Sequence, residues 1–419
     1  MSSNPTPLTR YQFRLLAVLA LINFVNFAAR QVMPSLVPIL RTQFNISDGQ
    51  LGWLHSSLFV VLALASVPSG FLADRFSRKG IIAFGILFWS AATFLGGLAS
   101  GFVMLVIARS FVGLGEAAYA PAAQSMISGS FPRERRASAQ AIFASGMLLG
   151  GACGQAAGGA ISQRYGWQMA LFVVALAGIF PAFALVGVQE PPRGPRSEVV
   201  PIRKILGVPA FLAMIAGGIC ITFSSVSLIS WGVDFAVTYK GFTVREASVV
   251  LSILALGSAI LGVLCGGFIA DRLQKRFSYV RLIAIGIALL FAAPFLLLAI
   301  QSDEQIIVLV GLFIATFFMS WYHGPVTAVI HDMMPRRAHS TSIGVYMFAT
   351  QLVGGLGPEV IGKISDQRDQ QVALQIASAV LVCGGLLMLL VIHFIRRDGL
   401  RHATVEAFHA EPPETPEQV

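Results

Sequence analysis

Long apolar runs, separated by short polar segments, dominate the chain from end to end. A helix that crosses a bilayer needs about 20 apolar residues, because each residue adds ~1.5 Å to its length. Open β-strands cannot take this place, since lipid leaves the backbone groups at a sheet edge without partners. The pattern therefore predicts an all-α membrane protein with twelve transmembrane helices. Their runs begin near Phe13, Gln50, Gly80, Phe102, Ala137, Trp167, Val208, Glu246, Val280, Gln305, Ser340 and Gln371.

The composition supports a lipid environment. Hydrophobic residues make up 56% of the chain and charged residues only 12%, against about 25% charged residues in an ordinary soluble domain. The first run continues past Arg30 to Leu40 without a convincing small-residue cleavage site, which indicates a retained helix rather than a signal peptide. The four cysteines lie within apolar runs without paired spacing, so we expect no disulfide, no metal site and no cofactor.

Lysine and arginine are concentrated in alternate loops and at the termini. The net charge is +9, and successive basic segments are separated by two predicted crossings. This positive-inside pattern places both termini in the cytoplasm of a multi-pass protein of a bacterial inner or plasma membrane. It accounts for the positive charge, so we expect no nucleic-acid partner. The basic segments are Arg10 with Arg14, residues 75–79, 133–136, 193–204 and 272–281, Arg336 with Arg337, and residues 396–401.

One polar segment divides the chain into two equivalent halves of six helices. Residues 189–204 read QEPPRGPRSEVVPIRK, and their four prolines and mixed charge indicate a cytoplasmic linker rather than a helix. GFLADRFSRK at 70–79 and GFIADRLQKR at 267–276 end equivalent helices, a parallel repeat typical of transporters with a midplane site between the halves. The expected parts are a cytoplasmic tail 1–12, a pseudo-symmetric pair of bundles 13–188 and 207–395, a linker 189–206, and a disordered cytoplasmic tail 396–419.

The repeated loop carries a charge cluster that we interpret as a gate on the cytoplasmic side. Its glycine lets two helices approach closely, and its acidic and basic side chains can pair. A solvated topology signal is the alternative for a single charged loop, but the second copy in register favours the gate. The first copy resembles the signature loop of the major facilitator superfamily, with Ser77 where a glycine is usual. The gating residues are Gly70, Asp74, Arg75, Arg78, Lys79, Asp271 and Arg272.

Three charged residues, Arg30, Arg109 and Glu116, lie within predicted helices rather than at their ends. A charge at the centre of a membrane helix costs about 2.5–3.5 kcal/mol, so each needs a partner or a purpose. Arg30 and Glu116 lie at similar depth, and we expect them to face each other in the central cavity. Glu116 could then carry the coupled proton, and its protonation would release Arg30 for an anionic substrate. The alternative is a permanent structural ion pair.

Further polar residues of the first half extend this candidate substrate site. Asn26 shares a helix face with Arg30, and Tyr119 shares one with Glu116. Arg109 begins an R-x-x-x-G pattern that looks like another superfamily signature. The alternative role for Arg109 is to satisfy backbone groups at the outer end of the helix.

The second half offers weaker candidates. Tyr322 and His323 complete the predicted substrate site, although His323 could also be a hydrogen-bonded packing residue. Asp234 and Glu359 lie near the outer ends of their helices, and for them we expect solvated rims.

Four segments are more specific than the general pattern. They read NFAARQVMPSLVPIL from Asn26, SGFLADRFSRK from Ser69, ARSFVGLGEAAYAPAAQSMI from Ala108, and GGLGPEVIGKISD from Gly354. Together they resemble the Spinster family of transporters over most of the membrane core. The resemblance implies a twelve-helix major facilitator bundle whose substrates are lysophospholipids or sphingosine phosphate.

The resemblance also implies roles for individual residues. Arg30 matches the arginine of the family's first-helix motif, and Arg109 and Glu116 match its fourth-helix motif. The family has an acidic residue where this chain has Ala29, which removes one candidate proton carrier. Either Glu116 couples protons by itself, or the protein is a facilitator driven by the substrate gradient.

These observations predict a monomeric, proton-coupled secondary transporter that moves an amphiphilic anion or zwitterion, such as a lysophospholipid, by alternating access. The expected partners are this substrate, protons and the lipid bilayer. The alternatives are an organic-anion or sugar-acid symporter, a drug exporter, or a receptor that binds without transporting. We do not expect an enzyme, because the sequence has no H-E-x-x-H, no G-x-S-x-G and no paired intramembrane aspartates.

Overall fold

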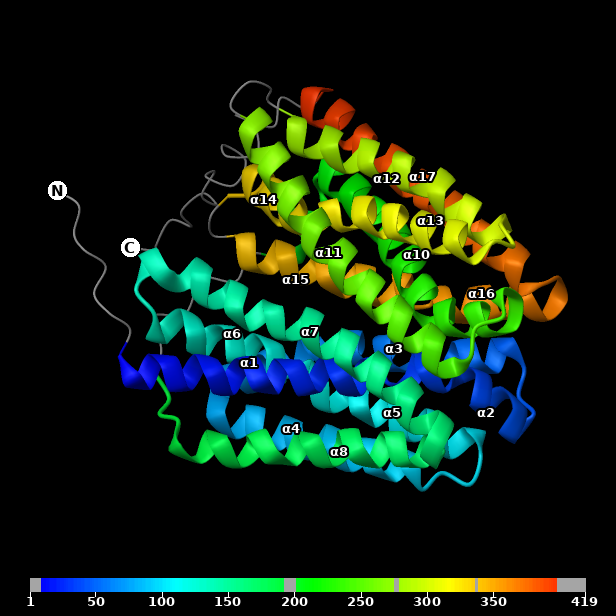
Figure 1. The fold of residues 1–419 in the computed structure, drawn as a ribbon. Coiled ribbons are helices and arrows are strands. Elements are labelled where there is room, and N and C mark those ends of the chain that lie inside the picture. Colours follow the sequence, from blue (N-terminus) through cyan, green and yellow to red (C-terminus); the bar gives the residue numbers. More distant parts are fainter. Residues whose placement is uncertain (1–8, 192–200, 275–278, 336–337, 398–419) are drawn as a thin grey trace, which may run out of the picture.

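The structure is a computed structural model that describes residues 9–191, 201–274, 279–335 and 338–397. Within these ranges the regular secondary structure is helical (Figure 1). The predicted tails 1–12 and 396–419 fall largely outside the described residues, as does half of the predicted linker 189–206. The end of that linker differs from the expectation, because Ile202–Leu206 forms the short helix α9.

The first half begins with a kinked crossing and continues through six further helices. The N-termini of α1 and α3 each have a capping box, in which Thr9 and Ser47 accept hydrogen bonds from the backbone of Gln12 and Gln50. The elements are α1 (Arg10–Gln31), the 3-10 turn η1 (Met33–Leu36), α2 (Val37–Phe44), α3 (Asp48–Arg75), α4 (Arg78–Gly97), α5 (Phe102–Ala117), α6 (Tyr119–Ser130), α7 (Arg133–Tyr165), α8 (Trp167–Ala184) and η2 (Leu185–Gly187).

The second half repeats this arrangement. Its elements after α9 are α10 (Pro209–Lys240), α11 (Val244–Gln274), α12 (Val280–Gln301), α13 (Gln305–Met319), η3 (Ser320–Tyr322), α14 (His323–Met333), α15 (His339–Ala349), the π-helical turn η5 (Thr350–Gly354), α16 (Gly357–Gln367) and α17 (Gln370–Arg397).

Eleven helical stretches of the described residues are long and apolar enough to cross a membrane. They begin close to the predicted positions. The remaining predicted crossing, near Ser340, is divided into α15, η5 and α16. Gly354, Gly355 and the Gly357–Pro358 pair lie where it divides, and such residues disfavour a continuous helix. The predicted twelve-helix architecture is therefore confirmed. Three other crossings are also interrupted, between α1 and α2, α5 and α6, and α13 and α14.

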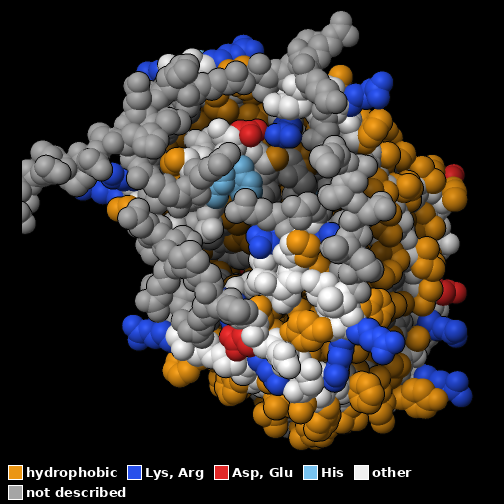
Figure 2. Space-filling view, turned by 90° about the vertical axis from the view of Figure 1, so that its left-hand side faces the viewer, with side chains coloured by type: hydrophobic (Ala, Val, Ile, Leu, Met, Phe, Trp, Pro, Cys, Tyr) orange, Lys and Arg blue, Asp and Glu red, His pale blue; other side chains and the backbone are white. Residues whose placement is uncertain are grey.

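The two halves lie side by side and meet along two seams. In Figure 1 the first half occupies the lower part of the view and the second half the upper part. One seam is formed by α3 and α16, and the other by α7 and α11. We call the end of the bundle at which α1 begins and α17 ends the near end, and the opposite end the far end. Figure 2 looks onto the near end, whose surface is hollowed.

Close helix packing inside the first half depends on glycine. A Cβ atom on Gly150 or Gly154 of α7 would meet the backbone of Phe24 or Ala28 in α1. Small residues at these positions let two backbones approach, which is the usual basis of helix association in membranes. This packing holds α1, and with it Arg30, firmly against α7.

Candidate functional site

Arg30 lies one residue before the end of α1, where the first crossing kinks. Pro34 in η1 has no N–H group, so it cannot donate to the carbonyl of Arg30 four residues earlier. Arg109 supplies the missing donor: its Nη2 lies 2.8 Å from that carbonyl oxygen, and its Nη1 lies 3.4 Å from the carbonyl oxygen of Ala29. Arg109 therefore fixes the end of the helix that carries Arg30.

Arg30 and Glu116 form an ion pair in the first half. The Nε of Arg30 lies 3.1 Å from Oε2 of Glu116, and its Nη2 donates to the same oxygen. The Arg30 side chain is 14% exposed, whereas that of Glu116 is 1% exposed. The guanidinium also lies over the rings of Phe27 and Phe59, at 4.9 and 5.7 Å from their centroids. The two residues that the sequence analysis paired are thus in direct contact.

The pair leaves hydrogen-bonding capacity unused. Oε1 of Glu116 is buried and has no partner in the structure, and the same holds for Nε of Arg109 and Nδ2 of Asn26. Buried polar atoms are usually hydrogen-bonded, so unsatisfied ones mark places where water, a proton or a ligand enters. The unpartnered oxygen of Glu116 is consistent with a site that changes its partners.

Asn26, Arg109 and Tyr119 are packed inside the first half rather than presented to the hollow. They are only 2%, 5% and 2% exposed. The hydroxyl of Tyr119 donates to Oδ1 of Asn23 at 3.0 Å, and the amide of Asn23 donates to the Phe143 carbonyl at 2.7 Å. In this conformation Arg109 and Tyr119 bind to α1, and Asn26 is buried within it. Arg30 is the member of the first-half set that is partly exposed.

Tyr322 and His323 lie at the junction of η3 and α14. Their rings are in contact, with centroids 4.2 Å apart, and His323 is exposed while Tyr322 is half-buried. Two further polar atoms of this half, the Tyr346 hydroxyl and Oε1 of Gln351, are buried without a partner in the structure. Gln351 belongs to the π-helical turn η5, and such turns occur frequently at functional sites.

The predicted gating residues lie at the near end. Arg75 ends α3, and Ser77 caps α4. The backbone N–H of Arg78 donates to Glu190 at 3.0 Å and Nζ of Lys79 donates to the Val186 carbonyl at 2.8 Å, so both contact their own half. Arg272 is exposed at the end of α11. Gly70 and the side chains of Asp74 and Asp271 are not part of the described surface.

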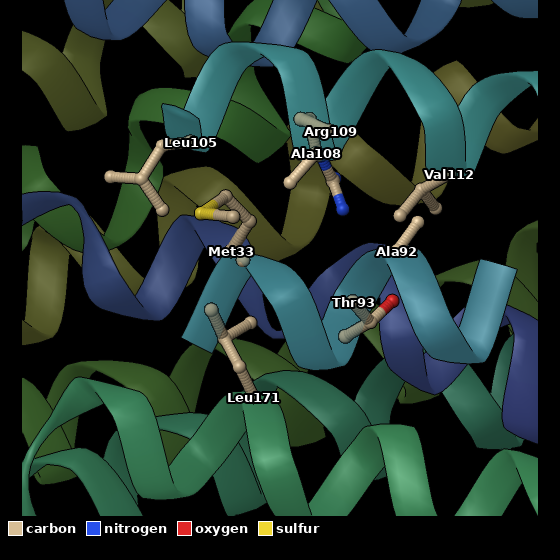
Figure 3. A pocket seen from close by; sticks show the side chains of 9 residues that line it. Met33, Ala92, Thr93, Leu105, Ala108, Arg109, Val112 and Leu171 are labelled. Atoms are coloured by element: carbon tan, nitrogen blue, oxygen red, sulfur yellow. The ribbon is translucent and has the colours of Figure 1, made fainter. Parts of the chain in front are cut away.

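A small cavity inside the first half lies between η1, α4, α5 and α8 (Figure 3). Its volume of about 10 Å³ corresponds to about one water molecule. Arg109 and Thr93 are the polar residues of its lining, and Met33, Leu105 and Leu171 contribute apolar side chains. The cavity can hydrate Arg109, but it is too small for an organic substrate.

Sequence reasoning missed two polar features. Asp234, expected on a solvated rim, has a fully buried side chain that pairs with Arg41 of α2, so that expectation was wrong. Glu359, for which a solvated rim was also expected, is partly exposed and pairs with Lys363 of α16. The second missed feature is a buried histidine. His55 in α3 is 3% exposed, and its Nε2 has no partner. The signal for the first feature was present: Arg41 and Asp234 are opposite charges near the outer ends of helices in different halves.

The fold and the buried charges define an integral membrane transporter. The sequence model described as Major Facilitator Superfamily matches residues 19–358, and the chain belongs to this superfamily. Protein spinster homolog 1 of Xenopus laevis is 27% identical, over 92% of this chain and 81% of that protein. An MFS-type efflux pump of Mycolicibacterium smegmatis is 24% identical, over 87% of each chain.

A solved structure supports the same assignment of the fold. It is described as a bacterial homolog of the human lysosomal transporter Spinster in an inward-facing and unoccupied conformation. Its TM-score is 0.84 at 24% identity, and the match covers 94% of this chain and 99% of that one. The resemblance to Spinster proteins that the sequence motifs indicate is confirmed by these relatives.

Proposed function

We propose that this protein is a proton-coupled secondary transporter for an amphiphilic anion or zwitterion of the lysophospholipid type. The observation that carries the proposal is the Arg30–Glu116 pair, in which a partly exposed cation is held by a buried carboxylate. Arg30 and Arg109 contribute two positive charges to this region and Glu116 one negative charge. The surplus positive charge favours an anionic group as ligand.

The surroundings of Arg30 suit an amphiphile. A guanidinium group binds phosphate and carboxylate with paired N–H donors, and the rings of Phe27 and Phe59 beside it offer an apolar surface. The resemblance to the Spinster family, which implies lysophospholipids or sphingosine phosphate as substrates, favours this substrate class. Tyr322 and His323 are proposed as polar contacts from the second half, since His323 is exposed there.

Glu116 and the substrate would compete for Arg30. When Glu116 is ionised, it occupies the guanidinium; when it is protonated, Arg30 is free for an anion. Substrate and proton would therefore bind together, and the pair would return to its resting contact after both are released. Ala29 cannot take part in this exchange, so Glu116 is the proposed proton carrier.

The orientation follows from charge. The near end carries the basic loops, so we place it and both termini in the cytoplasm. The hollow of Figure 2 then opens to the cytoplasm and the far end is the outer side. The halves would rock about the central site, with Asp74, Arg75, Arg78, Lys79 and the equivalent loop residues Asp271 and Arg272 closing the near end.

The test is uptake of labelled lysophospholipid into proteoliposomes with and without an imposed pH gradient. The native protein is compared with Arg30→Ala and Glu116→Gln, and exposed residues provide the matched controls Arg164→Ala and Glu304→Gln. Gradient-dependent uptake that is lost in both site variants and kept in both controls supports the proposal. Absence of uptake by the native protein would refute lysophospholipid as the substrate.

A drug exporter is the second candidate. The relative named as an efflux pump matches 87% of this chain, a share similar to that of the spinster proteins. An exporter of cationic drugs would not need the surplus positive charge around Arg30. Transport of a cationic dye that persists in Arg30→Ala would favour this alternative.

A further inference from the structure

A hydrogen-bonded cluster at the far end joins the two halves. Its centre is Arg41 of α2, whose Nη1 and Nη2 donate to the two carboxylate oxygens of Asp234 in α10, at 2.9 and 2.6 Å. Nη2 also donates to Oδ1 of Asp48 at 2.6 Å. Arg41 thus holds a carboxylate from each half. We call this set the outer cluster, with members Arg41, Asp48, Asp234, Ser365, Asp366 and Gln370.

The remaining members strengthen the same connection. The Asp366 carboxylate of α16 accepts the backbone N–H groups of Asp48 and Gly49, both at 2.8 Å. A carboxylate from one half therefore caps the N-terminus of α3 in the other half, where the helix dipole favours negative charge. Ser365 donates to Asp48, and Gln370 donates to Asp234 at 2.6 Å.

Burial makes the central contact costly to break. The Asp234 side chain is 0% exposed, and those of Arg41 and Asp48 are 26% and 18% exposed. A buried carboxylate that loses its cation is strongly destabilised, whereas an exposed ion pair contributes little. Separation of the halves at the far end must move Arg41 away from Asp234, because Arg41 and Asp48 belong to the first half and Asp234 to the second.

The backbone beside the outer cluster is packed for one closed state. A Cβ on Gly362 of α16 would lie 2.7 Å from the carbonyl carbon of Asp48, and one on Gly52 of α3 would lie 2.7 Å from Cα of Glu359. At the second seam, Ser248 of α11 abuts Gly159 of α7 and is 0% exposed. Both seams are therefore closed at the far end by direct contacts of backbone and small residues.

We propose that Arg41 and Asp234 form the outer gate of the transporter: their ion pair stabilises the conformation that is closed on the outer side, and opening breaks it. Arg41 lies on the same kinked crossing as Arg30, on the other side of the break at η1. A movement of Arg30 on substrate binding can therefore be transmitted along the backbone of this crossing to Arg41. The inference rests on the proposed alternating access and orientation, but not on the identity of the substrate.

The test measures exposure of the outer seam in reconstituted protein without substrate. The four native cysteines are replaced by serine, and Ser248→Cys introduces a thiol that the closed seam buries. A membrane-impermeant maleimide is added from outside. Arg41→Gln and Asp234→Asn should each raise the labelling rate about tenfold or more, as expected when a buried ion pair is broken. The double variant should not exceed the single ones.

Matched variants separate the gate from general damage. Asp303→Asn removes a carboxylate from a peripheral pair with Lys240 at the same end, in which Asp303 is fully exposed, and should leave labelling unchanged. Arg41→Lys keeps the positive charge and loses the paired donors, so it should raise labelling less than Arg41→Gln, a difference that general unfolding would not produce. Unchanged labelling in both single variants, or an equal rise in Asp303→Asn, would overturn the gate. Failure of lipid uptake with the labelling pattern intact would refute the proposed substrate and leave the gate standing.

Discussion

Two arginines on one kinked crossing make ion pairs of different construction. Arg30 holds one carboxylate, from its own half, and the second oxygen of that carboxylate is unpartnered. Arg41 holds two carboxylates, one from each half, and both oxygens of Asp234 and of Asp48 are bonded. A proton or an anion can therefore open the Arg30 pair without any movement of the halves. The Arg41–Asp234 contact opens only when the halves separate. In the proposed mechanism the first pair therefore responds to ligand and the second to conformation.

The largest expected effect concerns the ligand-sensing pair. Arg30→Ala should lower lysophospholipid uptake by about 100-fold, because a hydrogen bond to a charged group contributes about 1.5–3 kcal/mol. Arg30→Lys should have an intermediate effect, since lysine keeps the charge and loses the paired donors. Initial uptake rates in proteoliposomes measure both. Native-like uptake by Arg30→Ala would remove Arg30 from the substrate site.

Glu116→Gln should separate coupling from transport. Glutamine cannot exchange a proton, so accumulation driven by a pH gradient should disappear. Exchange of labelled for unlabelled substrate should continue, because it needs no net proton movement. Counterflow assays measure this exchange. If the variant still accumulates substrate in response to the gradient, Glu116 is not the proton carrier. The Arg30–Glu116 pair would then not respond to protons as proposed.

Gly362→Ala should act on the conformation-sensing region alone. Its Cβ would press on the backbone of Asp48, and such overpacking costs about 1–3 kcal/mol. The far end should then favour the open state, and labelling of the Ser248→Cys thiol should rise about tenfold. Gly101→Ala is the control, because a Cβ at Gly101 meets nothing within 4 Å. Equal labelling of the two variants would show that the α3–α16 seam does not control the gate.

A smaller effect is expected where Arg109 binds the backbone beside Arg30. Arg109→Gln should lower the free energy of unfolding by about 1–3 kcal/mol, because it leaves buried carbonyl groups unsatisfied. Pro34→Ala restores an N–H group for the carbonyl of Arg30, so Arg109→Gln should cost less in that background. A double-mutant cycle of thermal unfolding in detergent measures the difference. Strictly additive effects would argue against the role assigned to Arg109.

The smallest effect is expected for Tyr119→Phe. The variant loses the hydrogen bond to Asn23, which contributes about 0.5–1.5 kcal/mol to stability. The KM for the substrate should remain native, because the Tyr119 hydroxyl is turned toward α1 and not toward the hollow. A raised KM with unchanged stability would instead return Tyr119 to the substrate site.

The sequence predicts the fold well because each membrane helix corresponds to a local run of apolar residues. Helix spacing and depth also bring Arg30 and Glu116 together, since both properties follow from counting along two helices. Periodicity does not show whether a polar face meets a cavity or a neighbouring helix, which is why Tyr119 and Asn26 were expected to contact substrate. The break around η5 is not visible in the apolar periodicity either; its sequence signal is the cluster of glycines and the proline at residues 354–358.

The opposite charges of Arg41 and Asp234 are visible in the sequence, but the contact between them in the outer cluster is not. Arg41 and Asp234 are 193 residues apart and meet through the packing of one half on the other. An apolar pattern indicates burial in lipid or protein. It does not indicate which residues of the two halves come into contact in a given conformation. Charged residues near helix ends were therefore read as solvated rims, although one of them is fully buried.

The central claim is that Glu116 and an anionic substrate share Arg30. The most direct measurement is proton uptake by the purified protein when lysophospholipid is added in weakly buffered detergent solution. Linkage predicts uptake of roughly one proton for each substrate bound by the native protein, and none when Glu116→Gln binds the same substrate. Substrate binding to the native protein without proton uptake would contradict the claim and leave the Arg30–Glu116 pair as a structural contact.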